Sequence, residues 1–150
     1  MAGKEKIVLH TDGGSRGNPG IAGAGIVIYD SRGNVLKKES HPLGKITNNE
    51  AEYQAVIKGL EALKRTLGKE KLKTYNIEIR LDSELIANQL RGKYQLKEER
   101  LFPLFIKIWN MQVRDFPKFE IKCVPREKNA EADRLANQAM DAASPRPKLF

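Results

Sequence analysis

Residues 6–20 read KIVLHTDGGSRGNPG, and this stretch decides how the rest of the chain is interpreted. Lys6–Asp12 contains the apolar run Ile7-Val8-Leu9 and predicts a buried β-strand that ends in an acid. Gly13–Gly20 is rich in glycine and contains the pair Pro19-Gly20, which predicts a glycine-rich turn. An acid at the tip of a strand is not a residue that core packing would choose, so Asp12 becomes a candidate functional group.

Two further strands are predicted directly after this turn. Ala22–Tyr29 consists mainly of Gly, Ala, Ile and Val, and Asp30–Asn34 has the composition of a hairpin turn. Val35–Leu43 then continues as a third, more exposed strand. Three strands joined by short turns predict an antiparallel meander.

The apolar spacing then changes to that of a helix. Either Asn48 or Asn49 can cap this helix, and Gly68 ends it. Its apolar stripe is formed by Val56, Leu60, Leu63 and Leu67.

The remaining chain predicts two strands and three helices. In order, these are the strand Asn76–Leu81, a short helix from Ser83 to Leu90, the polar connection Arg91–Arg100, a helix over Leu101–Phe116, the strand Phe119–Val124 and a helix over Asn129–Ala142. Phe102, Phe105 and Trp109 stand at helical spacing and are expected in the core. The order of elements predicts an α/β (mixed α+β) fold, in which helices pack on the faces of a mixed sheet.

The composition fits one domain, which we place at residues 1–143, with residues 144–150 as a C-terminal tail. A net charge of +8, from 27 Lys plus Arg against 19 Asp plus Glu, favours a polyanionic partner, although many proteins are basic without such a role. No apolar run is long enough to span a bilayer, and no signal peptide is recognised. The single cysteine, Cys123, is expected to be a small buried hydrophobic residue. We therefore expect a cytoplasmic protein.

Four acids occupy positions that core packing does not explain. Asp12 and Asp82 each end a predicted strand, where sites form in open sheets. Glu52 shares the helix stripe of Val56 that faces the sheet, and Asp133 borders the apolar face of the last helix. Singly, each acid is more often an ordinary turn, cap or surface residue. Together they suggest a shared divalent cation, because an unpaired charge facing a core is costly.

The sequence motifs that surround these acids are similar to those of a known family. Residues 11–20 (TDGGSRGNPG), 47–52 (TNNEAE), 81–83 (LDS) and 131–136 (EADRLA) resemble, in this order, the type 1 ribonuclease H family, and the match runs from about Ile7 to Met140. The resemblance implies a five-stranded mixed sheet in the order 3-2-1-4-5, with helices on both faces and strand 2 antiparallel to its neighbours.

The same resemblance implies an activity and a cofactor. Members are endoribonucleases that hydrolyse the RNA strand of RNA–DNA hybrids, with little sequence specificity, and leave 5′-phosphate and 3′-hydroxyl ends. The family's acidic quartet falls on Asp12, Glu52, Asp82 and Asp133, which would act as catalytic residues and hold two Mg²⁺ ions, with Mn²⁺ as a common substitute. The expected partner is an RNA–DNA hybrid, and no obligate protein partner is evident, so a monomer is expected.

Substrate contacts also carry over by position. Asn18, Thr47 and Asn48 match residues that contact the DNA-strand phosphate or the minor groove. Asn49 and the backbone of Gly13, Gly14 and Ser15 match contacts to the RNA strand, and Glu84 stands where the family often has Gln. The alternative for Asn48 and Asn49 is helix capping, and the alternative for the glycines is a tight turn.

The chain departs from the family pattern in two places. Val124–Asn129 lacks the catalytic His that many members carry there; we hypothesise that Arg126 helps at the scissile phosphate, and a salt bridge to Glu127 or Glu131 is its alternative. Leu90–Leu101 is too short for the basic protrusion, so the chain resembles the compact archaeal and bacterial branch. Lys93, Lys97 and Arg100 could partly replace the protrusion, or the segment is a solvated loop.

Three interpretations of function follow. The first is the hybrid nuclease, with RNA–RNA duplexes left open as a second substrate. The second keeps the fold but acts on DNA, as transposases and resolvases do. The third is a catalytically silent module that binds hybrids, which the intact acidic quartet argues against. His10, inside the first strand, is expected to be a packed residue with no catalytic role.

Overall fold

The computed structural model describes residues 5–144. Five strands form one sheet in the order β3-β2-β1-β4-β5. β2 pairs antiparallel with β1 and β3, whereas β4 pairs parallel with β1 and β5. The predicted mixed sheet, its meander and its strand order are therefore confirmed. The strands are β1 Lys6–Gly17, β2 Gly20–Tyr29, β3 Val35–Ile46, β4 Asn76–Leu81 and β5 Phe119–Cys123.

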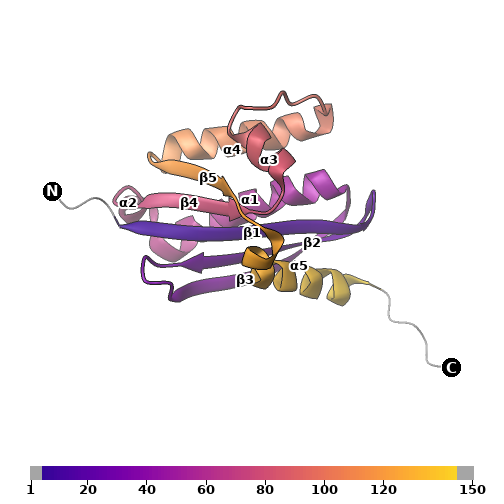
Figure 1. Cartoon of the computed structure of the whole chain (residues 1–150), viewed down its shortest axis with the longest axis horizontal. Coiled ribbons are helices and arrows are strands. Elements are labelled where there is room, and N and C mark those ends of the chain that lie inside the picture. The colour runs from indigo at the N-terminus through magenta and orange to yellow at the C-terminus, as the bar shows by residue number, and fades with distance from the viewer. Residues whose placement is uncertain (1–4, 145–150) are drawn as a thin grey trace.

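Helices cover both faces of this sheet (Figure 1). α5 crosses β1, β2 and β3 on the near face, and α1 lies behind the same strands with α4 packed beside it. α3 follows β4 and contacts β5. The helices are α1 Asn48–Leu67, α2 Lys69–Leu72, α3 Glu84–Leu90, α4 Phe102–Asp115 and α5 Ala130–Ala143, with 3₁₀ turns at Glu99–Leu101 and Arg126–Asn129.

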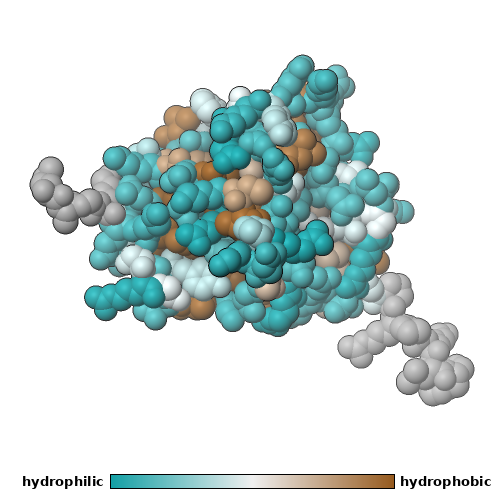
Figure 2. Space-filling view, viewed as in Figure 1, coloured by the Kyte–Doolittle hydropathy of each residue, from teal (hydrophilic) through white to brown (hydrophobic). Residues whose placement is uncertain are grey.

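The alternating strands bury side chains on both faces. The larger core lies between the sheet and α1, α3 and α4, and includes Leu9, Ile26, Leu60 and Ile79. A smaller cluster of Val27, Ala132 and Leu135 lies between β2 and α5. On the face that carries α5, hydrophilic side chains cover most of the surface and apolar ones form small patches (Figure 2). Within residues 5–144, no helix combines the length and the apolar character needed to cross a bilayer.

The glycine-rich segment is not the turn that we predicted. Residues 13–17 extend β1, pairing with β2 from Gly13↔Ala24 to Gly17↔Gly20, and only Asn18 and Pro19 make the turn. Gly13 serves close packing instead, because a Cβ there would lie 2.1 Å from the carbonyl oxygen of Ala51 in α1. The segment therefore brings β1 against the start of α1.

The cap of α1 also differs from the prediction. Thr47, and neither Asn48 nor Asn49, is the N-cap residue: its hydroxyl accepts from the Glu50 N–H at 3.2 Å, and its own N–H donates to Glu50 Oε1 at 3.1 Å. This reciprocal capping box satisfies two N–H groups that the helix cannot, and such a cap is worth about 1 kcal/mol. It leaves both asparagine side chains for other contacts.

Further corrections concern helix α4, the edge strand β5 and the end of the chain. Trp109 (56% exposed) and Phe102 (40% exposed) are not core residues, whereas Phe105 packs against the core as predicted. Cys123 is exposed, because β5 is the edge strand and this end of it is not covered. The short helix α2 was not predicted. Of the predicted tail, Ser144 caps α5, and residues 145–150 lie outside the described residues.

Candidate active site

Three of the four predicted acids converge where β1 and β4 run side by side. Asp12 lies on β1, Asp82 directly follows β4, and Glu52 lies near the start of α1. Each offers a carboxylate oxygen, and the three oxygens lie within 4.8 Å of one another. The arrangement arises because β1 and β4 are parallel neighbours, so that their carboxyl-terminal halves lie at the same end of the sheet.

The fourth acid, Asp133, joins from the other face of the sheet. It stands in the first turn of α5, and its carboxyl group is within hydrogen-bond contact of the Asp12 carboxyl group. Asp133 is not part of the tight group of three oxygens. The quartet therefore consists of a close triad, with Asp133 beside Asp12.

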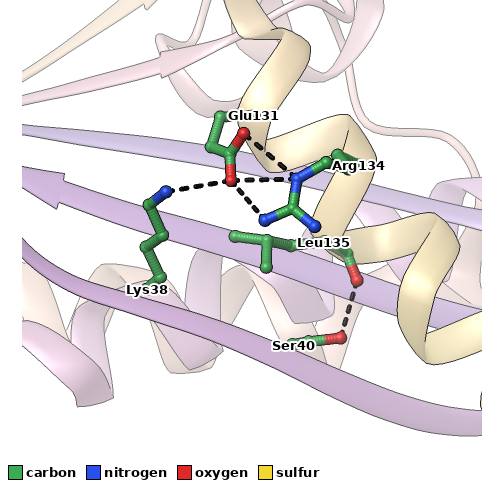
Figure 3. Close-up of polar contacts among 5 residues, drawn as sticks. All are labelled: Lys38, Ser40, Glu131, Arg134 and Leu135. Carbon is green, nitrogen blue, oxygen red and sulfur yellow. Dashed lines mark hydrogen bonds and ion pairs between the residues drawn. The ribbon is translucent and has the colours of Figure 1, made fainter.

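Contacts on the far side of α5 fix the helix turn that carries Asp133 (Figure 3). Glu131 accepts from Lys38 of β3 at 3.1 Å and from Arg134 one turn on, and the two cations lower the pKa of Glu131 to about 2. The Ser40 hydroxyl donates to the carbonyl oxygen of Leu135 at 2.6 Å. These contacts tie the first turns of α5 to β3, so Asp133 is presented from a fixed backbone.

The acids are crowded and poorly compensated. Burial, the nearby Asp82 and the hydrogen bond from Asp133 raise the pKa of Asp12 to about 8. Burial, followed by the charges of Asp12 and Asp82, raises the pKa of Glu52 well above its usual range. Arg126 lowers both pKa values but does not offset these effects. A cation bound among these acids would offset their mutual repulsion and favour their charged forms.

An open cavity of about 540 Å³ surrounds these acids. Its lining contains most of the predicted site residues: Asp12, Gly13, Gly14, Ser15, Asn48, Asn49, Glu52, Asp82, Arg126 and Asp133. Arg16, Ser83, Asn137 and Met140 also line it and were not predicted. Asn18, Thr47 and Glu84 are outside the lining; Glu84 is exposed at the start of α3.

Asn18 and Asn48 fasten the β1–β2 hairpin to the start of α1. Asn18 Oδ1 accepts from the backbone N–H of Asn48 at 3.0 Å, and Asn48 Oδ1 accepts from the backbone N–H of Ser15 at 2.9 Å. Since both amide oxygens are engaged, each Nδ2 group remains a donor with no partner within residues 5–144. Amide donors of this kind, from Asn48 in the cavity lining and the exposed Asn18 next to it, are suited to phosphate oxygens.

Arg126 lies among the acids and not in the alternative salt bridge. In the part of the chain that the structure describes, Glu131 pairs with Lys38 and Arg134, and no ion pair joins Arg126 to Glu127 or Glu131. After the last residue of α3, the Leu90–Leu101 segment contains only the 3₁₀ turn Glu99–Leu101. Arg100 Nη1 lies 3.7 Å from Glu50 Oε1. The expected absence of a helical protrusion there is confirmed for this segment.

Comparison with known proteins agrees with this geometry. A family model described as "Reverse transcriptase-like" matches residues 10–139. The chain is 36% identical to ribonuclease HI of Halobacterium salinarum, over 92% of this chain and 66% of that protein. It is 38% identical to a bifunctional protein of Mycobacterium tuberculosis, over 93% of this chain. The chain spans only 36% of the length of that protein and of the other relatives that match as strongly.

Solved structures agree in fold. The ribonuclease H1 called LC11, isolated from compost by a metagenomic approach, superposes with a TM-score of 0.88 at 47% identity, covering 92% of this chain and 97% of that chain. A second structure of that enzyme, in complex with an RNA/DNA hybrid, gives a TM-score of 0.87 at 45% identity and covers 91% of this chain and 98% of that chain.

Proposed function

Because this chain belongs to the type 1 ribonuclease H family, we propose that it hydrolyses the RNA strand of RNA–DNA hybrids as a metal-dependent endonuclease, acting as a monomer. The similar LC11 enzyme has been seen in complex with an RNA/DNA hybrid, which supports the same substrate here. The observation that carries the proposal is the group of Asp12, Glu52 and Asp82, whose carboxylate oxygens approach within 4.8 Å.

The residues present suit a pair of Mg²⁺ ions. The donor set consists of carboxylate oxygens, the ligands that Mg²⁺ prefers, and burial together with the neighbouring acids raises the pKa of Asp12. Asp12, Glu52, Asp82 and Asp133 would hold the ions. When bound, the metal pair supplies acidity that turns water into a nucleophile, and positive charge that stabilises the leaving 3′ oxygen.

The chain's own residues would bind and orient the substrate. The free Nδ2 groups of Asn18 and Asn48 donate to phosphate oxygens of the DNA strand, while Asn49 and the backbone of residues 13–15 face the RNA strand. Thr47 contributes by fixing the start of α1. The 2′-hydroxyl is the only group that marks RNA at a given site, and contacts to sugars and phosphates carry little base information. Cleavage with low sequence specificity follows.

Arg126 would act at the scissile phosphate, in the place of the histidine that the chain lacks. Its guanidinium lies close enough to Asp12 and Glu52 to lower the pKa of both. A cation in that position can bind a phosphate oxygen and stabilise the charge that develops on it. Glu84 is kept as a proposed substrate contact, on the ground of its position at the start of α3.

The decisive experiment uses an RNA–DNA hybrid labelled on either strand. With Mg²⁺ we expect cleavage of the RNA strand alone, with products that carry 5′-phosphate and 3′-hydroxyl ends. Asp12→Asn and EDTA should each abolish cleavage, whereas Glu70→Gln, at an exposed acid on α2, should not change it. Retention of the hybrid without cleavage would favour a silent binding module, and cleavage of DNA would favour a transposase-like nuclease. An RNA–RNA duplex tested in parallel decides whether it is a second substrate.

A further inference from the structure

Asn129 is a buried polar residue that the chemistry above does not use. It is 1% exposed and ends the 3₁₀ turn before α5. Its side chain reaches from this turn to the ends of two strands. Nδ2 donates to the carbonyl oxygen of Thr11 at 2.9 Å and to Asp82 Oδ2 at 3.0 Å, and Oδ1 lies 3.0 Å from His10 Nδ1. One amide therefore joins β1, the acid after β4, and the start of α5.

The orientation of this amide is fixed by its neighbours. Thr11 O and Asp82 Oδ2 are both acceptors, so the group facing them must be the NH₂, which has one hydrogen for each. The reversed amide would place its oxygen against a carbonyl and a carboxylate. Because Oδ1 then faces His10, the Nδ1 atom of His10 must carry a proton and donate it. His10 itself is held by Tyr29, whose ring packs edge-on at 5.2 Å.

From these contacts we infer that Asn129 is a positioning residue, which holds the Asp82 carboxylate in the orientation that the metal-binding triad requires, with His10 fixing the amide. The bond from Asn129 to Oδ2 restricts rotation of the Asp82 carboxylate, one oxygen of which lies in the shared site near Asp12 and Glu52. Repulsion among three acids would otherwise turn Asp82 away, and a group held in place beforehand costs less to order when a cation binds.

The same residue sets the two halves of the site relative to one another. Asn129 directly precedes α5 and lies one helical turn before Asp133. Its bonds to Thr11, beside Asp12, and to Asp82 therefore connect the helix that carries the fourth acid to the strands that carry the first and third. A shift of α5 along β1 would break these bonds and the acid geometry together.

The test measures metal binding without substrate. Asn129→Ala and Asn88→Ala each remove a buried asparagine. Asn88 lies on α3, outside the site, and its Oδ1 accepts a hydrogen bond from Arg91. We expect both variants to melt at lower temperature. Only Asn129→Ala should lower the affinity for Mn²⁺, as measured by calorimetry, and we expect the loss to be about tenfold or more. That is the usual effect of losing such a supporting contact. Wild-type Mn²⁺ affinity in folded Asn129→Ala would show that the residue is only structural.

A measurement on the wild-type protein covers the case in which Asn129→Ala does not fold. Nitrogen-detected NMR of the His10 ring should show a proton on Nδ1, and the Asn129 NH₂ resonances should shift when Mg²⁺ is added. A proton on Nε2 alone would overturn the assignment of the amide, and with it the inference.

The catalytic part of the inference rests on the proposed function, and kinetics separate the two. Asn129→Ala should need about tenfold more Mg²⁺ for half-maximal cleavage, with an unchanged KM for the hybrid. If the wild-type protein does not cut the hybrid, the proposed function fails, while the difference in Mn²⁺ affinity between Asn129→Ala and Asn88→Ala still decides the role of Asn129.

Discussion

At the scale of single residues, the main property of this protein is that it keeps acids together at a cost to its own stability. The pKa of Asp12 is raised from 3.8 to about 8 in the metal-free fold, chiefly by burial and by Asp82. A folded state that holds this proton more tightly than the unfolded chain gains stability at low pH. That gain is lost as the pH rises from about 4 to about 8.

Asp12→Asn should therefore stabilise the metal-free protein in a pH-dependent way. In EDTA we expect its melting temperature to exceed that of the wild type at pH 8, and the difference to vanish toward pH 4, where the folded wild type is already protonated at Asp12. Mg²⁺ at pH 8 should raise the melting temperature of the wild type much more than that of the variant. Glu70→Gln should show no such pH dependence. A difference that stays constant from pH 4 to pH 8 would contradict the electrostatic explanation.

Arg126→Ala tests the proposed role of Arg126 at the scissile phosphate. If its guanidinium stabilises charge on the scissile phosphate, kcat should fall by about 10²-fold with little change in KM. Lys128→Ala is the matched control, because Lys128 is exposed on the same 3₁₀ turn but does not line the cavity. Steady-state kinetics on one hybrid suffice, and an unchanged rate for Arg126→Ala would remove Arg126 from the mechanism.

The acids could be predicted from sequence and Asn129 could not, for a physical reason. Asp12, Glu52, Asp82 and Asp133 each break a local pattern at the end of a strand or on the apolar side of a helix, and a local pattern is visible in one sequence. Asn129 looks like any polar residue before a helix. Its role depends on His10 and Thr11, more than a hundred residues earlier, and only the folded chain brings them together.

At the scale of elements, glycines without a side chain allow α1 and α5 to approach the sheet closely. A Cβ on Gly25 of β2 would lie 1.9 Å from the carbonyl oxygen of Ala132 in α5, and Gly13 approaches α1 as closely from the other side. The sequence showed the glycines but not their purpose, because a glycine required for a turn and one required for packing look alike. The same limit applies to α4, whose apolar residues occur on both of its faces although only one face meets the core.

Gly13→Ala and Gly14→Ala should separate these two uses of glycine. The Cβ of alanine at residue 13 would meet α1 backbone atoms at 2.1–2.8 Å, whereas at residue 14 the nearest atom is the flexible end of Met140 at 3.7 Å. We expect Gly13→Ala to lower the free energy of unfolding by about 1–3 kcal/mol or more, and Gly14→Ala to leave it nearly unchanged. Urea titration of both variants measures this. Equal stabilities would show that α1 can move away from β1 freely.

At the scale of the whole molecule, a cavity lined by four acids lies in a protein of net positive charge. The net charge is +8, and a groove between α1 and α4, away from the four acids, is lined by Lys58, Lys64, Arg65, Lys107 and Arg114 together with Glu61. A net positive charge attracts a polyanion, while the acids of the cavity attract cations. The net charge could be read from the sequence, but its distribution could not.

Binding of the hybrid should therefore depend steeply on salt. Using Asp12→Asn to prevent cleavage, we expect affinity to fall about tenfold or more between roughly 50 and 200 mM salt, which corresponds to two or more neutralised phosphates. If the Leu90–Leu101 segment partly replaces the protrusion, Lys97→Ala should reduce the slope by about one phosphate, whereas Lys37→Ala on β3 should not. Fluorescence anisotropy at several salt concentrations measures the slopes. If Lys97→Ala and Lys37→Ala behave alike, that segment does not touch the substrate.

The exposed Cys123 has a practical use. It is the only cysteine in the chain, and it pairs in register with Leu81, the residue before Asp82. A thiol-reactive spin label or fluorophore would thus attach at one defined place, a single strand away from the acid cluster, without any engineered mutation. Paramagnetic Mn²⁺ arriving among the acids would broaden or quench the signal of such a probe, so the order in which metal and nucleic acid bind can be followed in real time.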